Sequence, residues 1–315
     1  MTTASPLLPT ADPNSRRTKR VRATQRAVWI EAPAFQRVLG LVLAMVSMTI
    51  IALLANLAFV SQVQHYTSQK ALYAQLRLSL AEGSTPIAPI NTHGGLVTPG
   101  TPIAVLVAPV IGVASEVIVE GTASSQTSQG IGHRRDTVLP CQVGSSVLMA
   151  RSGAYGGVGQ AFKSLTIGSK FSITMGQGGC TYQVTGSRNP GDAAPSAPSG
   201  KGGNLTLTTA AGTPYLPTEV YRIDAKLVTD GFDRSAVALP TGALPSSEAA
   251  MGTDTSNLFA LVLLLELLVG VAIATTWLWK RWGRWQAWIV AAPPLLAISL
   301  LCATAVTQWL LPNLI

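Results

Sequence analysis

Charged residues are scarce in this chain. Only 11% of its 315 residues are Asp, Glu, Lys or Arg, whereas 48% are hydrophobic. An ordinary soluble domain of this size carries more charge, so we expect lipid to be the solvent for part of the chain. The formal net charge is still +8. Nucleic-acid binding is not needed to explain it, because many basic residues lie in short segments beside apolar runs, where they anchor a protein in a membrane.

Histidine and cysteine are equally scarce, with three residues each. His65, His93 and His133 are scattered and have no Cys or carboxylate at the spacing of metal ligands, so no metal site is predicted. The glycine-rich run "GAYGGVG" (153–159) lacks the Lys and the following helix pattern of a phosphate-binding loop. The sequence therefore predicts no cofactor.

Three long apolar runs predict three transmembrane helices, at 38–60, 258–279 and 287–311. The first run is longer than the core of a signal peptide and lacks a cleavage site, which indicates an anchor. Basic residues stand before the first run and between the other two: Arg16, Arg17, Lys19, Arg20, Arg22, Arg26, Lys280, Arg281 and Arg284. Basic flanks favour the cytoplasm. We therefore predict a multi-pass protein of a bacterial plasma membrane, with a cytoplasmic N-terminus and residues 61–256 outside.

The outer part begins with an amphipathic pattern typical of a stalk helix, and then consists of short strands separated by turn residues. Regular short strands without long helical runs indicate an all-β barrel or sandwich. The predicted segments, in chain order, are a basic tail (1–37), the first span (38–60), a stalk helix and linker (61–101), the β domain (102–229), a linker (230–257), the second span (258–279), a cytoplasmic loop (280–286) and the third span (287–311).

One acidic residue, Glu266, lies near the middle of the second apolar run. A carboxyl group facing lipid is costly, so such a residue normally has a polar partner. Two interpretations remain open. Glu266 contacts another membrane subunit or has a proton-linked role, or it forms a hydrogen bond within its own three-helix bundle.

The order of the predicted strands resembles the sortase family, the cell-surface cysteine transpeptidases of bacteria, and in particular its actinobacterial, class E-like members. The segments that carry the resemblance are "VAPVIGVASEVIVEGT" (107–122), "GIGHRRDTVLPCQVG" (130–144), "VLMARSGAYGGVGQAFKSL" (147–165), "LTLTTA" (205–210) and "AKLV" (225–228). The resemblance implies a small eight-stranded β-barrel, here on the outer face and anchored by the three predicted spans.

The resemblance also locates the catalytic positions of the family, and two of them are altered. The family's Cys nucleophile falls on Ala210, and its His falls on Ser152. Its Arg aligns with Val220, two residues from Arg222, so Arg222 stays a candidate for that role on the same strand face. Acyl transfer needs an activated nucleophile, which a methyl group cannot provide. A lone Ser152 without His or Lys beside it is more typical of a turn than of a nucleophile.

Cys141 and Cys180 are the two cysteines of the predicted outer domain. On the outer side of a membrane such a pair forms a disulfide, or one of the two thiols serves as a relocated nucleophile. The sequence leaves both readings open, because it does not give the distance between the residues. Cys302 lies inside the third apolar run, where it is expected to be a small apolar residue.

These observations favour a pseudoenzyme that acts as a binding or scaffolding subunit of a cell-envelope or membrane complex. Its expected partners are other membrane or cell-surface proteins, with an extended peptide in the degenerate groove at Ser152, Ala210 and Arg222. The first alternative is a sortase-type cysteine transpeptidase or peptidase with relocated catalytic residues. The second is a structural subunit of an integral membrane complex, held mainly by its transmembrane helices.

Overall fold

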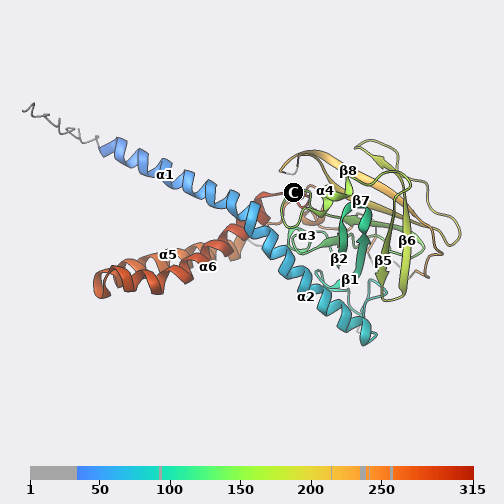
Figure 1. The fold of residues 1–315 in the computed structure, drawn as a ribbon, viewed down its shortest axis with the longest axis horizontal. Helices are drawn as coiled ribbons and strands as arrows, with labels where there is room; N and C mark the ends of the chain where they lie inside the picture. Colours follow the sequence, from blue (N-terminus) through green and yellow to red (C-terminus); the bar gives the residue numbers. More distant parts are fainter. Residues whose placement is uncertain (1–33, 92–93, 214, 235–238, 241, 256–257) are drawn as a thin grey trace, which may run out of the picture. The chain divides into compact units, whose positions relative to one another are not determined.

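The computed structural model describes residues 34–91, 94–213, 215–234, 239–240, 242–255 and 258–315 (Figure 1). The chain divides into two compact units, Met1–Val46 and Ser47–Ile315. Nearly all of the predicted basic tail lies outside the described residues. The same is true of His93.

Eight strands close into a barrel, so the predicted eight-stranded fold is confirmed. The spatial order of the strands is β1-β2-β3-β4-β7-β8-β6-β5. Their bounds are β1 Pro102–Ala108, β2 Val113–Glu120, β3 Ile131–His133, β4 Gly144–Met149, β5 Lys170–Met175, β6 Gly178–Arg188, β7 Gly203–Thr213 and β8 Leu216–Leu227. Closure leaves no free sheet edge, which is how a small all-β domain avoids edge-to-edge association.

The pattern of β7 shows why the barrel has a core and a groove on its outer face. Leu205 and Leu207 are buried in the main hydrophobic cluster, whereas Thr206 and Thr208 line the groove. Side chains alternate between the two faces of a strand, so the Leu-Thr repeat puts every second residue into the core. Across β5 and β6, Phe171 and the fully buried Tyr182 stack with ring centroids 5.7 Å apart.

The predicted stalk is helical, but it is not a free stalk. The helix α1 (Ala34–Ala55) continues through a π-helical turn η1 (Asn56–Val60) into α2 (Ser61–Ala81). Leu72 and Leu76 of α2 are buried against Val117 and Val119 of β2. The apolar face of the predicted helix is thus packed on the barrel. Figure 1 shows α2 beside β1 and β2.

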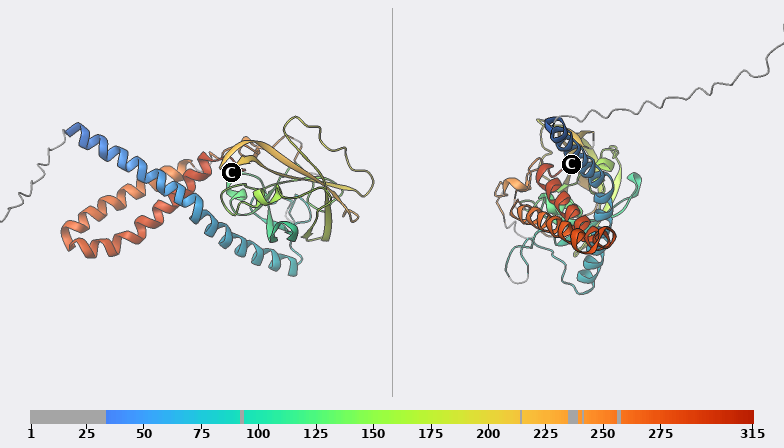
Figure 2. Two further views of the ribbon diagram at one scale, coloured as in Figure 1. Left: turned by 45° about the horizontal axis from the view of Figure 1, so that its top comes forward. Right: turned by 90° about the vertical axis from the view of Figure 1, so that its left-hand side faces the viewer.

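Two described helices are long and apolar enough to cross a membrane, α5 (Leu258–Trp282) and α6 (Arg284–Leu310). They lie side by side in Figure 2. The first predicted span is helical within α1 and η1, but it is not among these two. The predicted loop 280–286 is wrong in length, because both helices extend into it and only Gly283, at φ 107°, separates them. A positive φ of this kind is easily adopted only by glycine.

Short helical turns complete the fold, and several of them pack near the end of β4. They are η2 (Pro109–Ile111), α3 (Ser124–Thr127), α4 (Val158–Phe162) and η3 (Ser246–Glu248). α3 and η3 matter most for the site, because residues of both contact side chains that surround it.

Candidate functional site

The two positions predicted to correspond to the family's His and Cys, Ser152 and Ala210, lie just after β4 and within the last part of β7, which continues to Thr213. β4 and β7 run parallel, with Met149 opposite Thr208, and the amide of Ala150 donates to the carbonyl of Thr208 at 3.0 Å. Ser152 follows β4, and Ala210 lies two residues beyond Thr208. Both are buried, with exposed fractions of 1% and 0%.

One segment of the chain fills the space at these two residues. The amide of Ser152 donates to the carbonyl oxygen of Leu314 at 2.8 Å. The Leu314 side chain is fully buried in a cluster with Ala210 and Met149. The segment 311–315 directly follows α6 and turns back on itself through a hydrogen bond from Ile315 to Pro312. This segment therefore covers Ala210 and Ser152, the two positions that the resemblance singled out.

Arg151 holds the closing segment in place. Its exposed fraction is 2%, and its Nη1 donates to the backbone oxygen of Ile315 at 2.6 Å. Nη2 donates to the carbonyl and hydroxyl oxygens of Ser124, and Nε donates to Thr127 Oγ1 at 3.2 Å. Burial lowers the pKa of Arg151 to about 10. Because this value is still well above 7, the guanidinium group stays charged at neutral pH. It therefore links α3 to segment 311–315.

The closing segment is also bonded to the chain that leads into α5. The side-chain amide of Asn313 donates to the carbonyl oxygens of Ser247 and Ala249 at 2.6 and 2.8 Å. The backbone amide of Asn313 donates to the carbonyl of Gly252 at 3.0 Å. The two ends of the helical hairpin therefore meet beside the barrel site.

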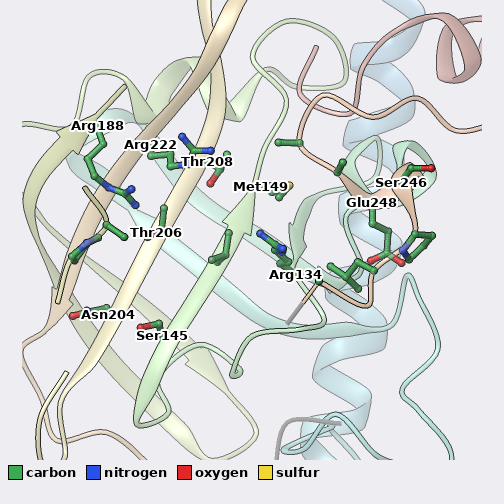
Figure 3. A pocket seen from close by; sticks show the side chains of 18 residues that line it. Arg134, Ser145, Met149, Arg188, Asn204, Thr206, Thr208, Arg222, Ser246 and Glu248 are labelled. Atoms are coloured by element: carbon green, nitrogen blue, oxygen red, sulfur yellow. The ribbon is translucent and has the colours of Figure 1, made fainter. Parts of the chain in front are cut away.

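The structure places Arg222 near the site but not opposite Ala210. In the antiparallel pairing of β7 with β8, Ala210 faces Val220 and Thr208 faces Arg222. Arg222 is therefore two residue pairs away, on the same face of the sheet. It lines an open groove of about 560 Å³ together with Thr208 and Met149 (Figure 3).

The cysteines and histidines that were weighed as alternative catalytic groups make contacts of their own. Cys141 and Cys180 form a disulfide, so the reading of either as a free nucleophile is wrong. Within the described part of the chain, the remaining free cysteine is the buried Cys302 of α6. His65 Nε2 lies 2.9 Å from Glu116 Oε1, in the packing of α2 on the barrel.

His133 is a buried structural histidine on β3. Its Nδ1 lies 2.8 Å from Glu120 Oε2, and its Nε2 lies 2.9 Å from the carbonyl oxygen of Val138. Burial alone would lower the pKa of His133, but the charge and hydrogen bond of Glu120 outweigh it, so the pKa lies above its ordinary value of 6.5. A protonated histidine paired with Glu120 therefore stabilises the folded barrel.

This pair predicts a pH dependence of stability. A raised pKa gives a stabilisation that is complete below pH 6.5 and is lost as the pH rises through the pKa of the folded state. We expect the free energy of opening of the β3 amides, measured by hydrogen exchange, to fall over this range. The free energy of opening should change less with pH in Glu120→Gln than in the wild type. An equal slope in both proteins would contradict the assignment.

Glu266 is exposed on α5, and no hydrogen bond or ion pair joins it to another residue that the structure describes. The reading of Glu266 as bonded within its own bundle therefore has no contact to support it. In the same described ranges, no cluster of three or more His, Cys, Asp or Glu side chains is arranged to hold a metal ion.

Sequence reasoning missed Arg151 and segment 311–315. Arg151 directly precedes the aligned position Ser152, and a charged residue beside that position was the available signal. The closing segment has no signal of its own, since only four residues follow the predicted third span.

Comparisons with known proteins give similarity to solved sortase structures. Sortase D5 of Clostridium perfringens is 18% identical, with a TM-score of 0.42 over 52% of this chain and 99% of that one. Sortase E of Streptomyces avermitilis is 22% identical, with a TM-score of 0.35 over 47% and 100%. Sortase C of Clostridium perfringens, solved with a C-terminal cell wall sorting signal motif, is 20% identical, with a TM-score of 0.37 over 57% and 89%. No family model and no curated protein matches the sequence.

Proposed function

We propose that this protein is a sortase-like membrane protein without catalytic activity, which serves as a binding or scaffolding subunit of a cell-envelope membrane complex. One observation carries the proposal. Ala210, at the position of the family's nucleophile, is fully buried under Leu314. Ala210 has no atom that could attack a carbonyl, and the Leu314 side chain packs directly against it.

The chemistry of acyl transfer supports this reading. A covalent mechanism needs a nucleophile that is activated by a neighbouring base or by a depressed pKa. Ala210 offers no such atom, and the hydroxyl group of Ser152 is buried. Arg151 is committed to oxygen atoms of α3 and Ile315. The contacts of the site therefore serve to hold chain segments together.

The helices give the proposed subunit its place in a membrane. α5 and α6 have the length and composition of membrane spans. The Cys141–Cys180 disulfide suits an oxidising compartment, which supports an outer location for the barrel. Basic residues at 280–281 favour the cytoplasm for the turn between the two helices. We propose a multi-pass orientation on these grounds, with the N-terminus in the cytoplasm.

Glu266 is the proposed contact with a partner in the membrane. Its side chain is exposed on a helix whose other exposed residues are mostly apolar, so an isolated helix pair would leave a carboxyl group in lipid. A polar group on a neighbouring membrane protein would remove this cost. The helices would then matter to assembly as much as the barrel does.

Copurification in mild detergent tests the proposal. We expect the wild-type protein to bring down a defined set of membrane proteins, and Glu266→Leu to reduce their yield by about tenfold, the loss expected for an interhelical hydrogen bond. Glu266→Gln keeps a hydrogen-bonding group and is the matched control. A lone wild-type protein, or equal yields with Glu266→Leu, would contradict the proposed partner contact.

A further inference from the structure

The groove stays open beyond its closed end. Its open part has a volume of about 560 Å³ and follows the outer face of β4, β7 and β8, with β6 on one side and residues 242–250 on the other (Figure 3). Polar residues of β7 and β4 line it, namely Ser145, Asn204, Thr206 and Thr208. Apolar residues also line it, namely Val147, Met149, Leu244 and Pro245.

Most of the charges around the groove are already paired. Arg188 holds Asp224 through two nitrogen atoms, and Thr206 donates to the same carboxylate at 2.8 Å. On the opposite side of the groove, Arg134 Nε lies 2.7 Å from Asp136 Oδ1. Glu248 is paired with Arg135. These carboxylates are therefore not available to another cation in the groove.

Arg222 is the exception. The register of the sheet puts Arg188, Arg222 and Thr208 in one row across β6, β8 and β7. Two arginines thus stand opposite each other on neighbouring strands, and the carboxylate of Asp224 is bonded to Arg188. Like charges opposite each other in a sheet destabilise it. Among the residues that the structure describes, no acceptor is bonded to the Arg222 side chain.

Thr208 adds an unused hydrogen-bonding group at the same place. Its exposed fraction is 2%, and its Oγ1 is buried without a hydrogen-bond partner in the described structure. Figure 3 shows Thr208 beside Arg222 in the wall of the groove. A buried hydroxyl group without a hydrogen-bond partner costs free energy. A ligand oxygen atom that accepts a hydrogen bond from it would remove this cost.

We propose that the groove binds an extended acidic peptide, with an Asp or Glu carboxylate of the peptide held by Arg222 and Thr208. A guanidinium group binds a carboxylate through two parallel hydrogen bonds, and the Thr208 hydroxyl supplies a third donor. The groove combines apolar side chains of β4 with polar side chains of β7 beside them. This mixed, extended lining suits the side chains of a peptide better than it suits a small free anion. This inference rests on the proposed binding function of the barrel.

A peptide library tests the inference on the full chain in detergent micelles. The immobilised protein is incubated with a mixture of acetylated, amidated pentapeptides, and bound peptides are identified by mass spectrometry. We expect peptides with Asp or Glu to be enriched about tenfold over those with Asn or Gln, as one charge-assisted contact predicts. About 1 M NaCl should weaken this preference, because the contact is partly open to solvent.

Three variants separate the site from general charge effects. The enrichment of acidic over amide peptides should fall to a ratio of about one in Arg222→Gln and decrease in Thr208→Val. It should persist in Arg77→Gln, which changes an exposed arginine on α2. No acidic preference in the wild type, or an unchanged preference in Arg222→Gln, would overturn the inference. Binding of inorganic phosphate at Arg222 without enrichment of acidic peptides would also overturn it. None of these results affects the copurification of membrane partners, which tests the proposed function separately.

Discussion

A cysteine introduced at position 210 is expected to be unreactive in the otherwise native chain and to react about 100-fold faster when Leu314 is also replaced by Asp. Leu314 and Ala210 are both fully buried in one cluster, so the new thiol would lie beneath the Leu314 side chain. A carboxylate in that apolar space is strongly unfavourable, and the closing segment is expected to leave the groove. Opening the segment would expose the thiol to solvent.

The measurement is the rate of alkylation by a maleimide under non-reducing conditions, in a Cys302→Ala background that removes the remaining free thiol of the described chain. Leu314→Met is the matched control, since it conserves volume and should keep the thiol protected. Fast labelling of Ala210→Cys with Leu314 intact would show that the segment does not close the site.

Removal of the Cys141–Cys180 disulfide is expected to lower the free energy of unfolding of the barrel by about 4 kcal/mol, the chain-entropy value for a sequence separation of 39 residues. The pair joins the turn before β4 to β6 inside the main core. The double substitution Cys141→Ala and Cys180→Ala removes the cross-link and leaves two small apolar side chains in its place.

Hydrogen exchange of the slowest barrel amides gives the stability, because these amides exchange through global opening. Cys302→Ala serves as the control, since this residue lies in α6 and outside the barrel. Unchanged protection in the double variant would mean that the disulfide contributes nothing to barrel stability. The proposed outer location of the barrel, which rests partly on this disulfide, would then have less support.

The barrel was predictable because its signals are local or regularly repeated. The short strands separated by turn residues indicated an all-β domain, and the two-residue offset of Arg222 from Val220 predicted the strand face on which the register places it. The disulfide was left open, because whether Cys141 and Cys180 meet depends on the pairing of strands that are distant in sequence.

The closing of the site could not be predicted for a similar reason. The bond between Arg151 and Ile315 spans 164 residues of sequence, and no periodic pattern connects its two ends. A buried arginine also runs against the usual exposure of charged residues, so composition gives no warning of it. The packing of α2 on β2 was missed because an amphipathic pattern shows that a helix has an apolar face, but not what covers it.

The most direct test of the proposed absence of catalysis is an assay of peptide transfer. The purified wild-type protein is mixed with a sorting peptide of the kind that sortases cleave and with an amine acceptor, before and after treatment with a thiol-alkylating reagent. Because Ala210 has no nucleophilic atom and lies beneath Leu314, we expect no transfer product in either sample. Turnover that alkylation abolishes would contradict this account and restore the interpretation of the protein as an enzyme with a relocated cysteine.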